Sequence, residues 1–379
     1  MAKKSNAQNS DRDDLIDLLQ TELNKANKDG GKIAYTLDEK DNPTDITDWI
    51  STGSSILDLA ISNRPHGGLP VGRMVEFNGL EGTGKSLISA HVVAETQKKG
   101  GMAVLIDTEN AGSPEFWTSL GVDLKKMLYV QCETVEDIFE QIEKMIAIVR
   151  KSNKDRILTI IVDSVAAAST KAELESEHGK DGYATGKSII ISKAMRKITN
   201  MIGKQKVLTI FTNQLRQNLN AMAFGDKYVV SGGKALAYHC SVRVRLNNAG
   251  KLKKGEEIIG NECKAVVVKN RMGPPQRTAN FDIYFDSGIA DYSSWIKVLK
   301  DNGLVKQAGA YYTYQKVDGT DWKFQSKDFI ATLQSDSKLK EEIYLKICDA
   351  VVMKYKDPNS KIVEDAQVAT DEEDAGAEE

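Results

Sequence analysis

The chain has 379 residues, of which 41% are hydrophobic and 28% are charged, and these are the proportions of an ordinary soluble protein. No apolar run is long enough to span a bilayer, and the first residues lack the apolar core of a signal peptide, so we expect a cytoplasmic protein without a membrane partner. The four cysteines have no C-x-x-C pairing and the four histidines no metal-ligand spacing, which argues against a disulfide framework or a zinc site.

The formal net charge of −3 is unevenly distributed. Residues 364–379 carry eight acids and no Lys or Arg, which leaves about +5 on residues 1–363. Two interpretations of this acidic tail remain open. It is either a disordered segment that competes with a polyanion for basic sites, or a solubilising segment without a regulatory role.

The N-terminal residues, 1–46, predict a helix followed by a short apolar stretch. Residues 11–27 have the pattern of an amphipathic helix, with one broad apolar face made of Leu15, Ile16, Leu18, Leu19 and Leu23. A Gly-rich joint follows, and then the apolar residues 33–35. This unit is too small to hold a core alone, so we expect it to dock on another structure.

Strand and helix patterns alternate from about residue 47 to residue 290. The clearest helix covers residues 134–150, where Thr134 is in position to cap the first turn. Alternation with nearly continuous apolar strands predicts a mainly parallel sheet covered by helices on both sides. The expected strands are residues 74–78, 102–107, 128–130, 157–163, 207–212, 242–246, 264–268 and 281–285. Beyond them, we expect a small α+β domain at 291–355 and an acidic disordered tail at 356–379.

Residues 79–86 match the G-x-x-x-x-G-K-S motif of a phosphate-binding loop. They are Gly79, Leu80, Glu81, Gly82, Thr83, Gly84, Lys85 and Ser86. Its glycines let successive N–H groups turn toward phosphate oxygens. Lys85 places a positive charge on the β- and γ-phosphates, and Ser86 offers a hydroxyl to Mg²⁺. A strand precedes the loop and a helix at residues 87–98 follows it, so the helix dipole also favours anions. The chain is therefore predicted to bind a nucleoside triphosphate.

Three other expected strands end in polar residues with roles in triphosphate chemistry. Asp163 ends the apolar run 157–163, as in a Walker-B strand, where it can orient Mg²⁺ through water. Glu109 follows the strand at 102–107 and is the candidate for polarising the attacking water, although a capping or salt-bridging role is the alternative. Gln214 follows the strand at 207–212, where it can contact the γ-phosphate.

Two irregular segments suit nucleic acid. Residues 216–233 mix hydrogen-bond donors with apolar side chains that can stack or wedge against bases. We expect the DNA contacts there to come from Arg216, Leu219, Met222, Phe224, Gly232 and Gly233. The second segment, 175–187, is Gly-rich, polar and unpatterned, and we assign its last residue, Lys187, to the same surface.

The chain resembles the RecA recombinase family, including its phage relatives of the UvsX type, from about residue 11 to the acidic tail. The resemblance rests on ordered matches along the chain, which lie at residues 50–54, 67–73, 79–86, 162–167, 194–197, 212–216 and 267–271. So many matches in one order are far more specific than any single motif.

The resemblance implies an α/β fold: a RecA-like P-loop NTPase core, an N-terminal helix–strand arm and a small α+β C-terminal domain. It implies ATP and Mg²⁺ as cofactors, and a homo-oligomeric helical filament on single-stranded DNA. Such a filament pairs with homologous double-stranded DNA and exchanges strands, with DNA-stimulated ATP hydrolysis. Single-strand-binding or mediator proteins are further implied partners.

The resemblance also assigns roles to individual residues. Glu109 matches the catalytic glutamate and Gln214 the γ-phosphate sensor, while Lys269 and Arg271 match cations that reach the γ-phosphate from a neighbouring protomer. Leu219 matches the apolar residue inserted between base triplets, and the N-terminal arm matches one that packs on the adjacent subunit. The chain departs from the bacterial pattern in having Arg271 for Lys, Phe116 for the adenine-stacking Tyr, and Ser113 for an Asp that contacts adenine.

Three other classes of nucleotide-binding protein fit the sequence less well than a recombinase. A ring helicase built on the same core would carry a larger N-terminal domain and an arginine finger in a different context. A nucleotide-regulated DNA-binding filament that exchanges no strands would not need Glu109, Lys269 and Arg271. A small-molecule kinase would need a lid and an acceptor-binding segment, and neither is evident.

Overall fold

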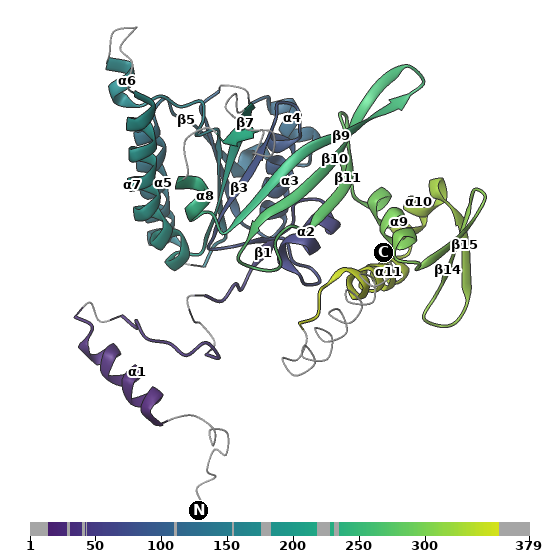
Figure 1. The fold of residues 1–379 in the computed structure, drawn as a ribbon, viewed down its shortest axis with the longest axis horizontal. Coiled ribbons are helices and arrows are strands. Elements are labelled where there is room, and N and C mark those ends of the chain that lie inside the picture. Colours follow the sequence, from purple (N-terminus) through teal and green to yellow (C-terminus); the bar gives the residue numbers. More distant parts are fainter. Residues whose placement is uncertain are drawn as a thin grey trace, which may run out of the picture. The chain divides into compact units, whose positions relative to one another are not determined.

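The computed structural model describes residues 14–28, 31–39, 42, 44–109, 112–153, 155–175, 183–217, 228–230 and 235–355. The chain divides into two compact units, Met1–Thr47 and Asp48–Glu379 (Figure 1). Among the described residues, no helix is both long and apolar enough to cross a membrane.

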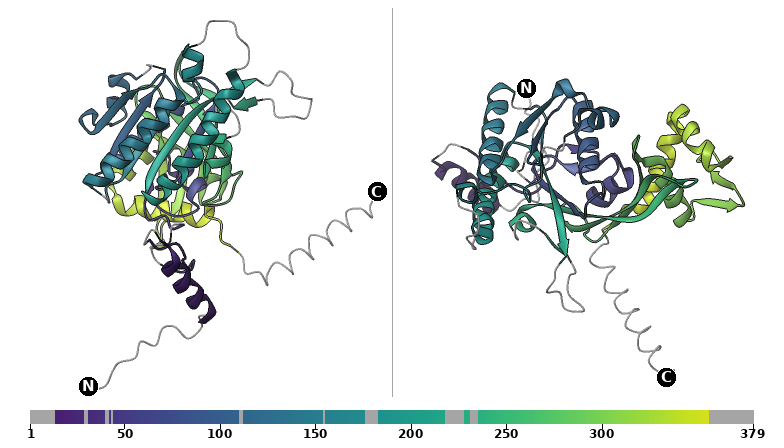
Figure 2. Two further views of the ribbon diagram at one scale, coloured as in Figure 1. Left: turned by 90° about the vertical axis from the view of Figure 1, so that its left-hand side faces the viewer. Right: turned by 90° about the horizontal axis from the view of Figure 1, so that it is seen from above.

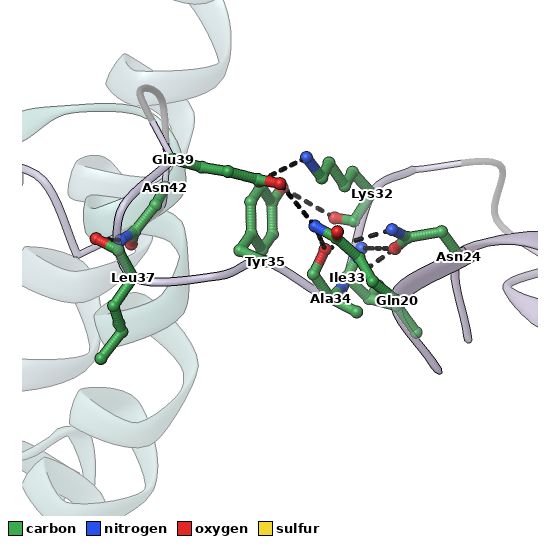
Figure 3. Close-up of polar contacts among 9 residues, drawn as sticks. All are labelled: Gln20, Asn24, Lys32, Ile33, Ala34, Tyr35, Leu37, Glu39 and Asn42. Carbon is green, nitrogen blue, oxygen red and sulfur yellow. Dashed lines mark hydrogen bonds and ion pairs between the residues drawn. The ribbon is translucent and has the colours of Figure 1, made fainter. Parts of the chain in front are cut away.

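The first unit contains helix α1 (Asp14–Ala26), which lies inside the predicted range. Residues 33–35, expected as a strand, form no strand within the described part of the chain. Instead, the side-chain oxygen of Asn24 accepts hydrogen bonds from the backbone N–H groups of Ile33 (2.8 Å) and Ala34 (2.9 Å), and its amide nitrogen donates to the Ala34 carbonyl (Figure 3). Side-chain amides therefore satisfy backbone groups that strand pairing would otherwise use.

The second unit is built on one large sheet. Its strand order is β12-β11-β10-β9-β3-β7-β6-β4-β5, with β8 (Tyr228–Val230) paired to β7. Six strands run parallel: β3 (Met74–Gly79), β4 (Met102–Asp107), β5 (Met127–Gln131), β6 (Leu158–Asp163), β7 (Val207–Gln217) and β9 (Val242–Lys254). The sheet continues antiparallel through β10 (Glu257–Asn270), β11 (Thr278–Tyr284) and β12 (Gly288–Ala290). The prediction of a mainly parallel sheet is confirmed.

Helices cover both faces of the parallel strands (Figure 2), and the buried side chains of β3, β4, β6 and β7 are shared between two hydrophobic clusters, one on each face. In β4, for example, Val104 and Ile106 belong to the cluster that includes α5 (Val135–Ser152) and α7 (Tyr183–Lys204). Leu105 points to the opposite cluster, which includes α2 (Ser55–Ser62), α3 (Lys85–Lys98) and α4 (Pro114–Ser119). Thr134 caps α5 as predicted, since its hydroxyl accepts from the Asp137 N–H at 3.1 Å.

The C-terminal region has the predicted mixture of helices and strands. It comprises α9 (Asp291–Asp301), β13 (Val305–Ala308), β14 (Tyr311–Gln315), β15 (Asp321–Gln325), α10 (Ser326–Ser335) and α11 (Ser337–Val351). Its buried residues Trp295, Phe329 and Ile343 belong to the same hydrophobic cluster as Ile56 and Ile61 of α2. A domain boundary near residue 290 remains a prediction. Short elements complete the unit: β1 (Trp49–Ile50), β2 (Leu69–Pro70), α6 (Lys171–Glu175), α8 (Ala235–His239) and a 3₁₀ turn at Leu124–Lys126.

Three segments are more regular than the sequence predicts. Strands β9 and β10 extend well beyond residues 246 and 264 as a long hairpin, in which backbone pairing suffices without an apolar pattern. Within the segment 216–233, the described residues form a paired stem, with Arg216 opposite Val229 and Gln217 opposite Tyr228. Residues 183–187 of the other irregular segment are the first turns of α7.

Candidate nucleotide-binding site

The phosphate-binding loop joins β3, which ends at Gly79, to α3, which begins at Lys85. Gly82 and Gly84 have φ values of 70° and 94°, which other residues rarely adopt. A Cβ at Gly79 would lie 2.5 Å from Thr83 Oγ1 and 2.6 Å from the Leu246 carbonyl oxygen, so only glycine fits there. The loop is thus a tight cradle that ends at the free N–H groups of a helix N-terminus, where anions bind.

Lys85 and Ser86 place one cation and one hydroxyl at this cradle. The Lys85 ammonium donates to the carbonyls of Leu80 (2.8 Å) and Gly79 (3.2 Å), so it lies back over the loop. Partial burial lowers the pKa of Lys85, while the carboxylates of Asp163, Glu109 and Glu81 act in the opposite direction. A partly desolvated ammonium interacts strongly with a phosphate because water screens it less.

Asp163 lies beside the loop, at the end of β6. Its Oδ2 accepts a hydrogen bond from Ser86 Oγ at 2.7 Å, and its Oδ1 accepts from Thr212 Oγ1 at 2.5 Å. The carboxylate is therefore fixed between α3 and β7. One carboxylate next to one hydroxyl is the donor set with which P-loop proteins hold Mg²⁺, so these residues fit that ion.

Glu109 follows β4 and lies on the side of the sheet where the parallel strands have their C-terminal ends. Its Oε1 accepts from Ser164 Oγ at 2.7 Å, and its backbone N–H donates to Asp107 Oδ1 at 2.8 Å. Asp107 and Asp163 are paired residues of adjacent parallel strands, which brings the two strand ends together. The Glu109 carboxylate is held by one hydroxyl and is not engaged in a described salt bridge.

Gln214 is the neighbour of the phosphate loop across the sheet, because it pairs with Gly79 in the register of β3 and β7. The residue before it, Asn213, donates to Glu76 Oε1 at 3.0 Å, and the guanidinium of Arg243 pairs with the other oxygen of this fully buried carboxylate. This buried network fixes β7 at Asn213, and with it the position of Gln214.

A pocket of about 250 Å³ opens next to the loop. Residues 82–87 form one side, and Asn248, Cys263, Ile283 and Phe285 lie among the residues on the other. The aromatic ring in its described lining is that of Phe285, which sequence reasoning missed. Phe116, which was predicted to stack on adenine, is half-buried on α4 with its ring against Trp117. Phe116 is not among the residues that line this pocket. Ser113 caps that helix.

Lys269 and Arg271 lie away from the phosphate loop of their own chain. Lys269 pairs with Arg243, which pairs with Glu76, three residues before Gly79 and two strands away. Lys269 donates to the carbonyls of Ala237 (2.7 Å) and Tyr238 (2.9 Å) at the end of α8. Arg271 is exposed.

Of the predicted DNA contacts, the structure describes Arg216 and Lys187. Arg216 is exposed in the stem of the β7–β8 hairpin. Lys187 is in α7, and its ammonium donates to the carbonyls of Ala166 (2.9 Å) and Ala168 (2.5 Å), so part of its hydrogen-bonding capacity is used within the chain. The other predicted contacts lie outside the described residues: Leu219, Met222, Phe224, Gly232 and Gly233.

Comparison with known proteins identifies the family. Residues 17–290 match the family described as the RecA N-terminal domain. The chain is 37% identical to Protein RecA of Heliobacterium modesticaldum over 80% of this chain and 84% of the relative. It is 35% identical to Protein RecA of Corynebacterium pseudotuberculosis over 99% of each. The chain belongs to the RecA family.

Membership in the RecA family means that the protein is an ATP-dependent DNA recombinase and a DNA-dependent ATPase. It also accounts for the phosphate loop, since nucleotide binding, DNA binding and filament formation belong to the RecA family. Sequence reasoning found the acids and amides at the strand ends of this site. It missed Ser164 and Thr212, although each is a hydroxyl residue next to or at the end of a predicted strand.

Proposed function

We propose that this RecA-family protein binds ATP and Mg²⁺ at residues 79–86 and assembles as a helical filament on single-stranded DNA, which then exchanges strands with homologous double-stranded DNA. The observation that carries the proposal is the meeting of four residues on neighbouring parallel strands. Gly79 and Asp163 end β3 and β6, and Glu109 lies two residues beyond β4. Gln214 lies within β7, paired with Gly79, and the strands are neighbours in the order β3, β7, β6, β4.

The triphosphate is held by the loop and the base by the adjoining pocket. Backbone N–H groups of the loop and the Lys85 ammonium neutralise phosphate oxygens. Ile283 and Phe285 line this pocket, and Phe285 is 60% exposed, so its ring is open to a purine. Asn248 and Cys263 stand at the same pocket, so base contacts come from β9 and β10 as well as from β11.

Mg²⁺ is held by Ser86 and, through water, by Asp163. When bound, the ion neutralises charge on the transferred phosphoryl group. Thr212 keeps the Asp163 carboxylate oriented, and the hydrogen bond from Ser86 holds the hydroxyl beside it, so both groups that would hold the ion are already together.

Hydrolysis is assigned to Glu109, which orients the attacking water and accepts its proton. Ser164 holds one carboxylate oxygen and leaves the other for the water. Gln214 contacts the γ-phosphate and lies two residues before Arg216 on the same strand. Because β7 runs without interruption from the nucleotide to the hairpin stem, a change at the phosphate reaches the DNA-facing segment through one rigid element.

The site is completed by a second protomer. Lys269 lies on the order of 10 Å from the loop along the strands and on the order of 10 Å across them, which is too far to reach the phosphates bound by its own chain. We therefore assign its ammonium to the γ-phosphate bound by another chain. The exposed Arg271 acts with it. Assembly and ATP binding are thereby coupled, because each site needs residues from two chains.

The N-terminal arm supplies a second contact between protomers. All five apolar residues of the α1 face are exposed, and so are Ile33 and Leu37. Strand β5 ends the sheet, and its Leu128 and Tyr129 are about half exposed. To add as a strand to this edge of the next protomer, residues 33–35 would exchange their hydrogen bonds with Asn24 for hydrogen bonds with β5. Such an edge would otherwise be open to unspecific pairing.

Three measurements on one preparation test the function. ATP hydrolysis should rise on addition of single-stranded DNA, and Lys85→Ala should remove the activity, whereas Lys98→Ala on the exposed face of α3 should not. Electron microscopy should show filaments rather than rings. A labelled single strand should then displace its identical strand from a homologous duplex, and filaments that hydrolyse ATP without displacement would contradict a recombinase.

We propose the cytoplasm as the compartment of this protein. The four free, buried cysteines suit a reducing compartment.

A further inference from the structure

One buried carboxylate, at the C-terminal end of β4, holds the loop that carries Glu109. Asp107 is 3% exposed, and its Oδ1 accepts the Glu109 N–H at 2.8 Å. Its Oδ2 accepts the Gly112 N–H at 3.1 Å, so the same carboxylate binds the backbone on both sides of residues 110–111. The position of the Glu109 backbone therefore depends on how the Asp107 side chain is oriented.

The third group on this carboxylate is the hydroxyl of Tyr129, which donates to Oδ2 at 3.1 Å. Tyr129 is on β5, paired with Leu105 of β4, and it is 49% exposed at the open edge of the sheet. Its ring also supports the loop, because a Cβ on Gly112 would lie 3.3 Å from Tyr129 Cε2. Burial and the Asp107 carboxylate both raise the pKa of Tyr129, which keeps the hydroxyl protonated and able to donate.

We propose that Tyr129 is a positioning residue for ATP hydrolysis, whose hydroxyl fixes the Asp107 carboxylate and through it the backbone of Glu109. The inference rests on the hydrolytic role of Glu109 proposed above. Two hydrogen bonds in series, from Tyr129 to Asp107 and from Glu109 to Asp107, connect an exposed residue at the sheet edge to the carboxylate that orients water. Misplacement of such a group by about 1 Å costs on the order of 100-fold in rate, so a partial loosening has a measurable effect.

The test is Tyr129→Phe, which removes the hydroxyl and keeps the ring against Gly112. The Tyr129 hydrogen bond is lost, but Asp107 keeps its hydrogen bonds from Glu109 and Gly112. Because only part of the positioning is lost, we expect kcat for DNA-stimulated ATP hydrolysis to fall roughly 3- to 10-fold. KM for ATP and filament length on DNA should stay at wild-type values, because the ring packing and the phosphate loop are intact, and Tm should fall by no more than a few °C. Tyr311→Phe, at a tyrosine of similar exposure in β14, is the matched control and should leave kcat unchanged.

A second comparison separates positioning of Glu109 from any other effect. In a Glu109→Gln background the water-orienting carboxylate is gone, so adding Tyr129→Phe should not lower the residual rate further. An unchanged kcat in the single variant, a multiplicative loss in the double variant, or shorter filaments that account for the lower rate would each overturn the proposal. If wild-type protein showed no DNA-stimulated hydrolysis, the proposed function itself would fail, and the comparison of variants would not arise.

Discussion

The Ser86 hydroxyl donates to Asp163 Oδ2 at 2.7 Å, although the two residues are 77 positions apart in the sequence. The other oxygen of this carboxylate accepts from Thr212. One carboxylate thus joins the first turn of α3 to the end of β6 and to Thr212 of β7. The phosphate loop, β6 and the strand that leads to β8 are connected at a single point.

Asp163→Asn should weaken the use of Mg²⁺ in hydrolysis. The amide keeps the size of the side chain but removes the charge and replaces one acceptor oxygen with a donor. We expect a loss of roughly 100-fold in kcat and a shift of the Mg²⁺ titration to higher concentration. ATPase rates across a Mg²⁺ series measure both, with Asp318→Asn in an exposed turn as the control. An unchanged Mg²⁺ curve would be incompatible with the assignment.

Glu109→Gln should retain nucleotide binding and lose hydrolysis. Glutamine still accepts the Ser164 hydrogen bond through its carbonyl oxygen, so the local structure is kept, but it cannot take a proton from water. Filaments formed with ATP should therefore be long-lived. Binding of a fluorescent ATP analogue and the rate of filament loss after dilution measure the two properties. Weak nucleotide binding in this variant would point to a structural role.

The strand ends were predictable because an apolar run followed by an acid is visible in the sequence, as at Asp163 and Glu109. The hydroxyls that hold these acids were not, since Ser164 and Thr212 gain their roles only through strand order. Phe285 was missed for a similar reason: it follows an antiparallel strand far along the chain, and the sheet brings it beside the loop. The β7–β8 stem has no apolar alternation, so only its pairing reveals it.

Removal of residues 364–379 should tighten binding to double-stranded DNA. The tail lies outside the described residues, and the prediction rests on its eight acids, which can occupy basic sites that otherwise bind phosphates. Without it, the affinity should rise and the slope of log affinity against log salt should change. Titration of labelled duplex at several salt concentrations tests this. Equal affinities with and without the tail would favour a solubilising role.

The stability of the second unit should fall as pH rises from about 4 to about 7. Burial raises the pKa of Asp58 to about 7 and that of Asp291 to about 6, both from 3.8. The folded state therefore holds protons that the unfolded state releases, and stability is lost as pH rises through this window. Between pH 6 and pH 8 we expect a loss of about 2 kcal/mol and a drop in Tm of about 3 °C.

Asp58→Asn should flatten this pH dependence, whatever it does to Tm at a single pH. The Asp58 carboxylate accepts from Ser51 and Thr52, which favour its charged form, and burial outweighs them. Thermal unfolding of both proteins at several pH values gives the comparison. Parallel curves for wild type and variant would show that Asp58 does not titrate in this range.

Mixed filaments should reveal whether Lys269 and Arg271 act on a neighbour. Each variant alone, Glu109→Gln or Arg271→Ala, should hydrolyse little ATP. In an equal mixture, a site is intact when an Arg271→Ala protomer supplies Glu109 and a Glu109→Gln protomer supplies Arg271, so about a quarter of the sites should recover. Arg271 is the better choice for this test because Lys269 also holds the end of α8. If both groups served the same chain, no site in the mixture would contain both, and the rate would stay at the level of the separate variants.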